Sequence, residues 1–349
     1  MLLQTNSRGW SRTKVVQLTL CLGVSALCLY LAVRGMDFAR TAQELRQSSP
    51  MPIVGAVVFL FLSYWIRAYR WRYLLAPIKN IPVRPLFRST LIGFMGNYLF
   101  PFRAGEIMRA VSIGQTQQIS KSAALGSIVL ERVFDGVVIS LTPFVVLAAV
   151  ELPPWVTRVN FGLLALYMSG LVGLVIATQR GWTDLWIQRA IMLLPMRFAR
   201  RAGPIATEFL QGMKGITHSR GLLPIALLSV ACWVVHGMYF FLMFKALDIE
   251  LSFSAALVLQ MVIGLGVILP AAPGYVGTFE YFTVLGLALF GIGHETAFAY
   301  ALLAHVFQFV PVSAVGLFFA LRKGFHQLGS GDAWLDEKFE VDGQLRVEG

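Results

Sequence analysis

The chain has 349 residues, of which 57% are hydrophobic and 13% charged, with a mean hydropathy of +0.69 and a net charge of +11. Soluble domains keep about a quarter of their residues charged, so this composition excludes them and indicates a polytopic membrane protein. Nucleic-acid binding is also excluded, because Lys and Arg cluster between apolar runs and form no sustained basic face with interleaved aromatics.

Six apolar runs are long enough to cross a bilayer as helices. A hydrocarbon core of about 30 Å needs about 20 apolar residues, since a spanning backbone must satisfy its own hydrogen bonds. The runs cover residues 15–33, 52–66, 133–150, 159–178, 222–246 and 296–321. No small-residue cleavage site follows the first run, so it is predicted to be a retained helix. The sequence thus predicts an all-α polytopic integral membrane protein with about six full transmembrane helices.

The positions of Lys and Arg predict the orientation of these spans. With residues 1–14 in the cytoplasm and each interrupted segment returning to its own side, inner segments hold 18 Lys and Arg and outer segments hold 4. Membrane proteins keep an excess of Lys and Arg in cytoplasmic loops. Both termini are therefore predicted to be cytoplasmic, with residues 15–325 forming the transmembrane domain.

Arginines and aromatic residues gather at the inner end of the second span. They are Trp65, Arg67, Arg70, Trp71, Arg72 and Tyr73. Such a mixture is typical of an interfacial anchor, because both residue types favour the border between lipid and water. Recruitment of a lipid headgroup by these arginines is the alternative.

Two further apolar segments, 86–100 and 253–292, are interrupted by Pro and Gly and do not read as simple spans. The interrupting residues are Pro101, Gly105, Pro270, Pro273, Gly274 and Gly277. Broken backbone at membrane depth is tolerated only where protein or a water-filled cavity surrounds it. The pattern therefore predicts two re-entrant segments that enter from opposite sides and border a cavity, as in an inverted repeat. Chance similarity of two Pro/Gly hairpins is the alternative.

Charged residues lie in or beside these apolar segments in two sets. Arg103, Glu106 and Arg109 share one helix face, whereas Glu131, Arg132 and Asp135 follow where another apolar run begins. The three arginines balance the three carboxylates, which favours an ion-pair network that supports the broken helix. Such residues also mark substrate pathways in membrane proteins, so the competing interpretation is a binding site for a lipid headgroup.

In the headgroup interpretation, Arg103 and Arg109 are the anion ligands, because Arg binds phosphate oxygens bidentately and stays charged. Glu106 and Glu280 would position the arginines, bind a headgroup amine or carry a coupling proton. Asn97 would contact substrate or cap freed backbone groups. His236 and His305 are predicted to be satisfied core histidines. No metal site, cofactor site, catalytic set or nucleotide loop is predicted.

The remaining segments are predicted to lie at the cytoplasmic surface. Residues 179–221 mix apolar and aromatic residues with arginines, which favours an amphipathic connector on the anionic inner leaflet. A solvated connector is the alternative. Residues 326–349 are acidic and polar, so we expect a mobile tail.

Three motifs resemble a known family. They read NYLFPFRAGEIMRA (97–110), ERVFDG (131–136) and PAAPGYVGTFEY (270–281), and they resemble the lysylphosphatidylglycerol synthase transmembrane-region family of flippase-like proteins. The resemblance implies a plasma-membrane protein, and we expect that membrane to be a bacterial inner membrane. In the aminoacyl-lipid synthases of the family, the corresponding region is held to move modified anionic phospholipid between leaflets. The large transferase domain of the synthases is not found after Phe325, so a stand-alone flippase-like protein is expected.

The leading hypothesis is therefore a lipid translocase and not an enzyme. It would move an anionic phospholipid or a polyprenyl-phosphate lipid across the membrane without ATP hydrolysis. One alternative is an intramembrane enzyme that uses Glu106, Glu131 or Glu280 on a lipid-linked substrate. The other is a non-transporting partner of a lipid or glycan synthase.

Overall fold

The structure is a computed structural model and describes residues 12–146, 154–183, 195–214, 222–267 and 269–322, with Leu185, Arg189 and Met192. Helices dominate the described chain, and no strand occurs in it. The predictions for residues 1–11, for much of 179–221 and for the tail 326–349 lie outside the described residues. The elements are α1 (Arg12–Val33), α2 (Phe38–Arg46), α3 (Pro50–Leu75), α4 (Val83–Leu99), α5 (Ala104–Gln117), α6 (Lys121–Val146), α7 (Pro154–Gln179), α9 (Met196–Met213), α10 (Leu222–Ala246), α11 (Phe253–Gly266), η2 (Pro273–Tyr275), α12 (Thr278–Ala288) and α13 (His294–Leu321).

Several helices are built to cross a membrane. Among the described residues, four helices are long and apolar enough to cross a membrane, namely Pro50–Leu75, Val156–Gln179, Leu222–Ala246 and His294–Leu321. A fifth span results if α1 and α2, bent by 84° to each other, are counted as one. The predicted span at 133–150 falls on α6, which is 26 residues long but carries charged residues. The polytopic all-α membrane class is confirmed, and the number of spans is approximate.

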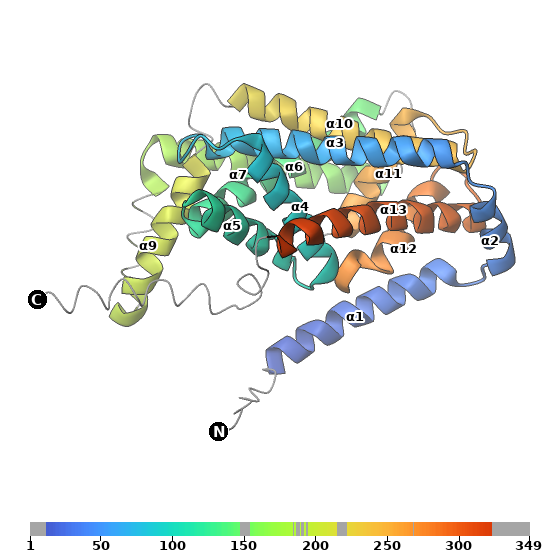
Figure 1. The fold of residues 1–349 in the computed structure, drawn as a ribbon, viewed down its shortest axis with the longest axis horizontal. Coiled ribbons are helices and arrows are strands. Elements are labelled where there is room, and N and C mark those ends of the chain that lie inside the picture. The colour runs from blue at the N-terminus through green and yellow to red at the C-terminus, as the bar shows by residue number, and fades with distance from the viewer. Residues whose placement is uncertain are drawn as a thin grey trace, which may run out of the picture.

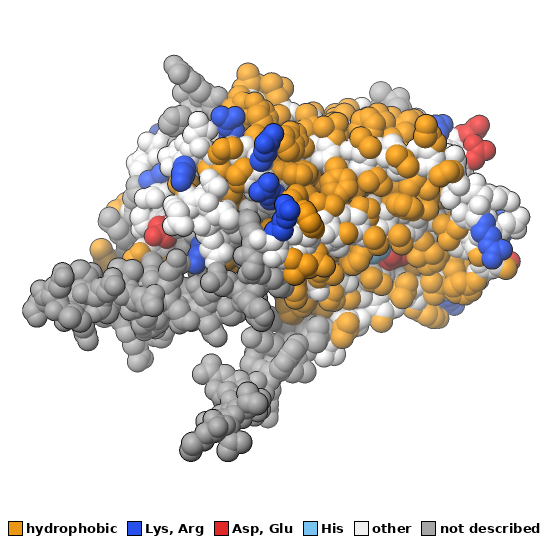
Figure 2. Space-filling view, in the orientation of Figure 1, with side chains coloured by type: hydrophobic (Ala, Val, Ile, Leu, Met, Phe, Trp, Pro, Cys, Tyr) orange, Lys and Arg blue, Asp and Glu red, His pale blue; other side chains and the backbone are white. Residues whose placement is uncertain are grey.

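The surface agrees with a lipid environment. Figure 2 shows a broad apolar face over the middle of the molecule, with Lys and Arg toward the end where α9 lies and others at the opposite end, where α2 lies. Large apolar side chains point outward along several helices, for example Val58 on α3, Leu166 on α7 and Leu227 on α10, each about 60% exposed or more. Exposed apolar surface on this scale is unusual for a soluble monomer and normal for a protein in a bilayer.

The bundle is organised around α3 and α10, which lie side by side (Figure 1). The backbone N–H of Ser49, just before α3, donates to the carbonyl of Ala246 at the end of α10, at 2.7 Å. The two helices are therefore antiparallel. Buried Leu60, Tyr64 and Phe240 belong to the apolar core around them.

The two interrupted segments form helical hairpins that enter the bundle from opposite ends. Hairpin α4–α5 follows the end of α3, hairpin α11–α12 follows the end of α10, and those two ends are opposite because the helices are antiparallel. The tips meet where Arg103 Nη2 donates to the carbonyl of Val267 at 3.0 Å. The hairpins approach each other from opposite ends of the bundle, as the prediction requires, whereas their entry from opposite sides of the membrane and an inverted-repeat symmetry stay predictions.

The breaks lie where Pro and Gly predicted them, with one exception. Pro101 is in the first break, and Pro270, Pro273, Gly274 and Gly277 are in the second. Gly274 and Gly277 have φ values of 75° and 88°, in the left-handed region that favours glycine. Gly105 lies instead in the first turn of α5, so its assignment as a break residue is corrected: it permits close packing against α4.

We expect Gly105→Ala to lower the free energy of unfolding by about 1–3 kcal/mol, as overpacking typically does. A Cβ atom at this position would lie 1.8 Å from the carbonyl oxygen of Gly93, so α4 and α5 would have to separate. Thermal unfolding in detergent measures the change. Gly173→Ala on α7 is the control, since nothing lies within 4 Å of its added Cβ atom. Equal stability of both variants would contradict this packing.

Within the predicted connector, α9 packs against α6. A Cβ atom on Gly126 of α6 would lie 2.0 Å from the carbonyl oxygen of Phe209, and one on Gly212 would lie 1.9 Å from the carbonyl oxygen of Ala123. The described part of the connector is thus a helix fixed to the bundle, which argues against a freely solvated segment. Its contact with the inner leaflet stays a prediction.

Candidate functional site

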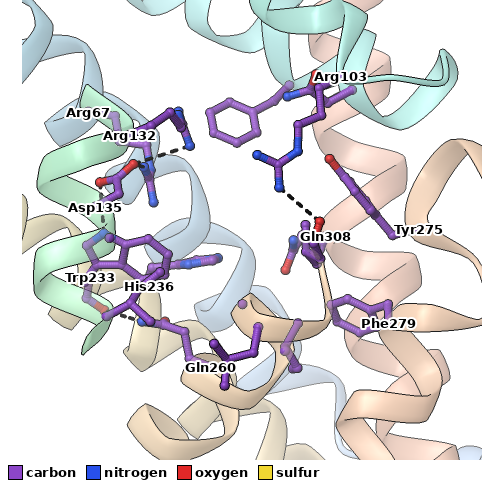
Figure 3. Close-up of a pocket in the computed structure, with 18 of the residues that line it drawn as sticks. Arg67, Arg103, Arg132, Asp135, Trp233, His236, Gln260, Tyr275, Phe279 and Gln308 are labelled. Atoms are coloured by element: carbon purple, nitrogen blue, oxygen red, sulfur yellow. Dashed lines mark hydrogen bonds and ion pairs between the residues drawn. The ribbon is translucent and has the colours of Figure 1, made fainter. Parts of the chain in front are cut away.

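A cavity of about 230 Å³ lies inside the bundle where the two hairpins meet (Figure 3). Both hairpins contribute side chains to it, together with α3, α6, α7, α10 and α13. Its charged lining residues are Arg67, Arg103, Glu106, Arg132 and Asp135. The cavity therefore lies between the two broken helical hairpins and a cluster of charged side chains.

Glu131 on α6 is the most buried carboxylate of this cluster. Arg109 donates to it through both Nη atoms, each at 2.9 Å. Arg70 Nη2 and Arg132 Nη2 lie 3.3 and 3.0 Å from Oε1. The Glu131 side chain is fully buried, so its charge is compensated by these arginines and not by solvent.

Asp135, one turn further along α6, is the second buried carboxylate. Arg67 Nη1 lies 3.0 Å from Oδ2, and Arg70 Nη1 lies 2.8 Å from Oδ1. Arg132 Nη1 is 3.3 Å away, and the indole N–H of Trp233 donates to Oδ1 at 3.0 Å. Asp135 therefore links α3, α6 and α10 at the wall of the cavity.

The prediction that Arg67 and Arg70 belong to an interfacial anchor is wrong. They are 4% and 0% exposed, because α3 continues to Leu75 and its last turns face α6. Arg72, the third arginine, is half-buried and donates to Asn80.

Arg67 and Arg70 also belong to the buried charge cluster, so the predicted balance of three arginines against three carboxylates does not hold. The cluster contains the arginines 67, 70, 103, 109 and 132 and the carboxylates 106, 131 and 135. Positive charges exceed negative charges by two.

The structure separates the predicted headgroup residues into two groups. Arg103, Glu106 and Asn97 line the cavity. Arg109 does not: it is 2% exposed, paired with Glu131, and stacked over the ring of Trp71 with its Cζ at 3.8 Å from the centroid. We therefore assign Arg109 to the support of Glu131, whereas Arg132 and Asp135, expected only as support, face the cavity.

Glu280 also lies outside the cavity lining. Its Oε2 accepts from the backbone N–H of Gly277 at 2.6 Å, so it caps the start of α12. Its Oε1 is 2.5 Å from His305 Nδ1, and His305 Nε2 is 2.7 Å from the carbonyl oxygen of Gly274. Glu280 and His305 thus fix the second break, and His305 is satisfied as predicted.

Polar cavity residues on other helices were not predicted. His236 on α10 lines the cavity, and neither ring nitrogen has a partner among the described residues, which contradicts its prediction as a satisfied core histidine. Gln260 on α11 and Gln308 on α13 line it as well. Each is an isolated amide in an apolar helix, and that isolation is the sequence signal from which they could be found.

The chemistry of this lining suits anion binding. Arginine donors face the cavity, and the carboxylates that would act as acids or bases are engaged by arginines. Among the described residues, no group of three or more His, Cys, Asp or Glu is arranged to hold a metal ion.

Comparisons with known proteins agree with this architecture. The family described as "Lysylphosphatidylglycerol synthase TM region" matches residues 18–316, from α1 into α13. A UPF0104 membrane protein of Methanothermobacter thermautotrophicus is 29% identical over 308 residues, which cover 85% of this chain and 91% of that protein. Glycosyltransferase AglD of Haloferax volcanii is 23% identical over 328 residues, which cover 84% of this chain and 52% of AglD.

Proposed function

Because this chain belongs to the lysylphosphatidylglycerol synthase TM region family, we propose that it is a flippase-like lipid translocase. It moves a lipid with an anionic phosphate headgroup, an anionic phospholipid or a polyprenyl-phosphate lipid, across the membrane without ATP hydrolysis. The observation that carries the proposal is the arginine-rich cavity between two broken hairpins that enter from opposite ends.

The excess of arginine supports an anionic ligand. Uncompensated charge at membrane depth is costly, so a bound phosphate would stabilise a cluster with two surplus positive charges. Arg103 is the best placed ligand, because no ion pair with a carboxylate is recorded for it among the described residues and its polar contacts are with the neutral carbonyl of Val267 and the side chain of Tyr275. Arg132 also lines the cavity, but its Nη atoms are paired with Glu131 and Asp135, so Arg103 is the arginine that a ligand would meet first.

A second cavity suggests where lipid tails would lie. It has a volume of about 340 Å³ and extends from the tips of the hairpins to Cys21 of α1. It shares Asn97, Arg103, Val267 and Tyr275 with the first cavity. In the proposed mechanism the headgroup crosses through the arginine-lined cavity, while acyl or isoprenoid tails remain in the bilayer beside the tips.

We place the protein in the plasma membrane with both termini in the cytoplasm. The basis is the 18 to 4 distribution of Lys and Arg between the inner and outer segments. The positive charge of the inner segments would face the anionic inner leaflet.

The test is transport by the purified protein in liposomes. We expect labelled anionic phospholipid or polyprenyl-phosphate lipid to cross faster than in protein-free vesicles, with no nucleotide added. Chemical quenching of the label in the outer leaflet measures the rate. Movement no faster than in empty vesicles for every lipid tested would overturn the proposal. A chemically altered lipid, detected by mass spectrometry, would indicate an intramembrane enzyme instead.

A second candidate function is that of a membrane partner that binds a glycosyltransferase and does not itself transport lipid. The relation to AglD favours it, since AglD is a glycosyltransferase by name and the alignment covers only 52% of its length. In that case Arg103→Ala should leave the cellular phenotype intact, whereas a translocase should lose function.

A further inference from the structure

The second break holds a buried acid and a buried imidazole that do not belong to the arginine cluster. Glu280 on α12 and His305 on α13 are 4% and 8% exposed. Among the described residues, each forms its ion pair with the other alone. His305 lines the arginine-lined cavity, whereas Glu280 does not. Ionisable residues inside a membrane protein are usually paired or carry protons, so the number of hydrogens on this pair matters.

The contacts of the pair fix that number. His305 Nε2 lies 2.7 Å from the carbonyl oxygen of Gly274, and a carbonyl oxygen only accepts, so Nε2 carries a hydrogen. Nδ1 of the same ring lies 2.5 Å from Glu280 Oε1. Two acceptors without a hydrogen between them repel each other at this distance, so a second hydrogen lies on Nδ1 or on Oε1. The pair therefore holds one proton more than a neutral imidazole and a carboxylate do together.

Removing this proton breaks one of the two contacts. If the remaining hydrogen stays on Nε2, the lone pair of Nδ1 faces the carboxylate of Glu280. If it moves to Nδ1, the lone pair of Nε2 faces the carbonyl oxygen of Gly274. The pair also changes from net neutral to net negative, which is costly for buried groups. Loss of the proton should therefore separate His305 from Glu280 or from Gly274.

Both partners of His305 belong to the second break, and the break contacts the other hairpin. Gly274 is the middle residue of η2, and Glu280 caps the start of α12 through its Oε2. Tyr275, the next residue of η2, contacts the side chain of Arg103 at the tip of hairpin α4–α5 (Figure 3). The shared proton thus joins α13 to the segment that meets Arg103.

Other titratable side chains near the pair come from several elements. α1 meets the break through Ser25, whose hydroxyl accepts from the backbone N–H of Ala272, and α11 carries no titratable residue. The groups that border the same cavity or contact α13 are Arg67 of α3, Tyr98 of α4, Arg103 before α5, His236 and Tyr239 of α10 and Tyr275 of η2. His236 is the other histidine among them, so a test of the pair has to separate its contribution.

We propose that Glu280 and His305 form a proton-binding site that holds the second break closed, and that loss of the proton releases η2 and the contact of Tyr275 with Arg103. The ligand is a proton from the cavity, where the His305 side chain is 10% exposed. The use of this site in transport rests on the proposed function, whereas the site itself does not. In that use, proton release is the step that frees the tips of the two hairpins from each other.

Amide hydrogen exchange of residues 274–280 in detergent measures the release. Protection is expressed relative to the free amide rate at each pH and followed over the range in which the protein stays folded. It should fall by about tenfold or more from acidic to alkaline pH, as expected from the loss of a buried hydrogen bond to a charged group. Residues 55–65 of α3 are the internal reference and should keep one level of protection.

Glu280→Gln gives the sharpest outcome. Its amide can donate to His305 Nδ1 and accept from the backbone N–H of Gly277, so it reproduces the contacts of the protonated pair without an acid that titrates. Protection of the break should stay high at every pH. Glu280→Ala removes both contacts, and its break should have low protection at every pH.

Two variants are the controls. Glu295→Gln removes a carboxylate from the first turn of α13, and His236→Gln removes the other histidine of the cavity. Both should keep the wild-type dependence of protection on pH. Wild-type protection that does not change with pH, or a change that persists in Glu280→Gln, would overturn the proposal.

Transport in liposomes, with the same pH on both sides, separates this proposal from the proposed function. Lipid should cross faster at the pH values where the break is released, and there Glu280→Gln should be about tenfold slower than wild type. If no lipid moves faster than in empty vesicles while exchange changes with pH as expected, the translocase is contradicted and the proton site is supported. Transport that depends on pH without a change in exchange at the break would overturn the proton site.

Discussion

Replacing Glu131 with Gln should lower the free energy of unfolding by about 3–5 kcal/mol, the usual cost of removing one partner from a buried ion pair. Arg109, Arg70 and Arg132 all contact this fully buried carboxylate. The substitution keeps the size of the side chain but removes the negative charge. Because the cluster already has two surplus positive charges, the variant leaves three of them in a region of low dielectric constant.

Thermal or denaturant unfolding in detergent measures this loss. Glu250→Gln is the control, because Glu250 is exposed after the end of α10 and should change stability little. The double variant Glu131→Gln/Arg109→Gln should recover part of the loss, since Arg109 then no longer leaves an unpaired charge. A Glu131→Gln variant as stable as wild type would show that the arginines are compensated in another way.

Replacing Arg103 with Gln should reduce the rate of lipid transfer between leaflets by about 10- to 100-fold, because a hydrogen bond to a charged group contributes about 1.5–3 kcal/mol. Arg103 faces both cavities at the point where the hairpin tips meet. Arg103→Lys should reduce the transfer rate less, since lysine keeps the positive charge and loses only the bidentate hydrogen-bond geometry.

Stability measurements separate this effect from misfolding. Arg103 is exposed, so Arg103→Gln should unfold at nearly the wild-type temperature while transport falls. Arg46→Gln on α2 removes an equal charge at an exposed position away from the cavities and should keep the wild-type rate. A wild-type rate for Arg103→Gln would argue against phosphate binding at the tips.

The role of Arg109 shows why helix position alone was insufficient to identify a ligand. Arg103 and Arg109 lie on the same predicted face, six residues apart, and both were predicted to bind a headgroup. In the structure Arg103 precedes α5 at the tip, whereas Arg109 lies in the second turn of α5 and meets Glu131 of α6. Only the packing of α5 against α6 decides which of the two remains available to a ligand.

The sequence by itself determined the membrane class, the positions of most helices and the two Pro/Gly breaks. Hydropathy, helix length and backbone restrictions are local properties, so they can be read along the chain. The tertiary structure alone decided that Arg67 pairs with Asp135, 68 residues away, and that Gln260 and Gln308 share one cavity. Long polar side chains take their partners from whichever helix packs opposite them, and the packing of helices that are distant in sequence is not written in any local pattern of residues.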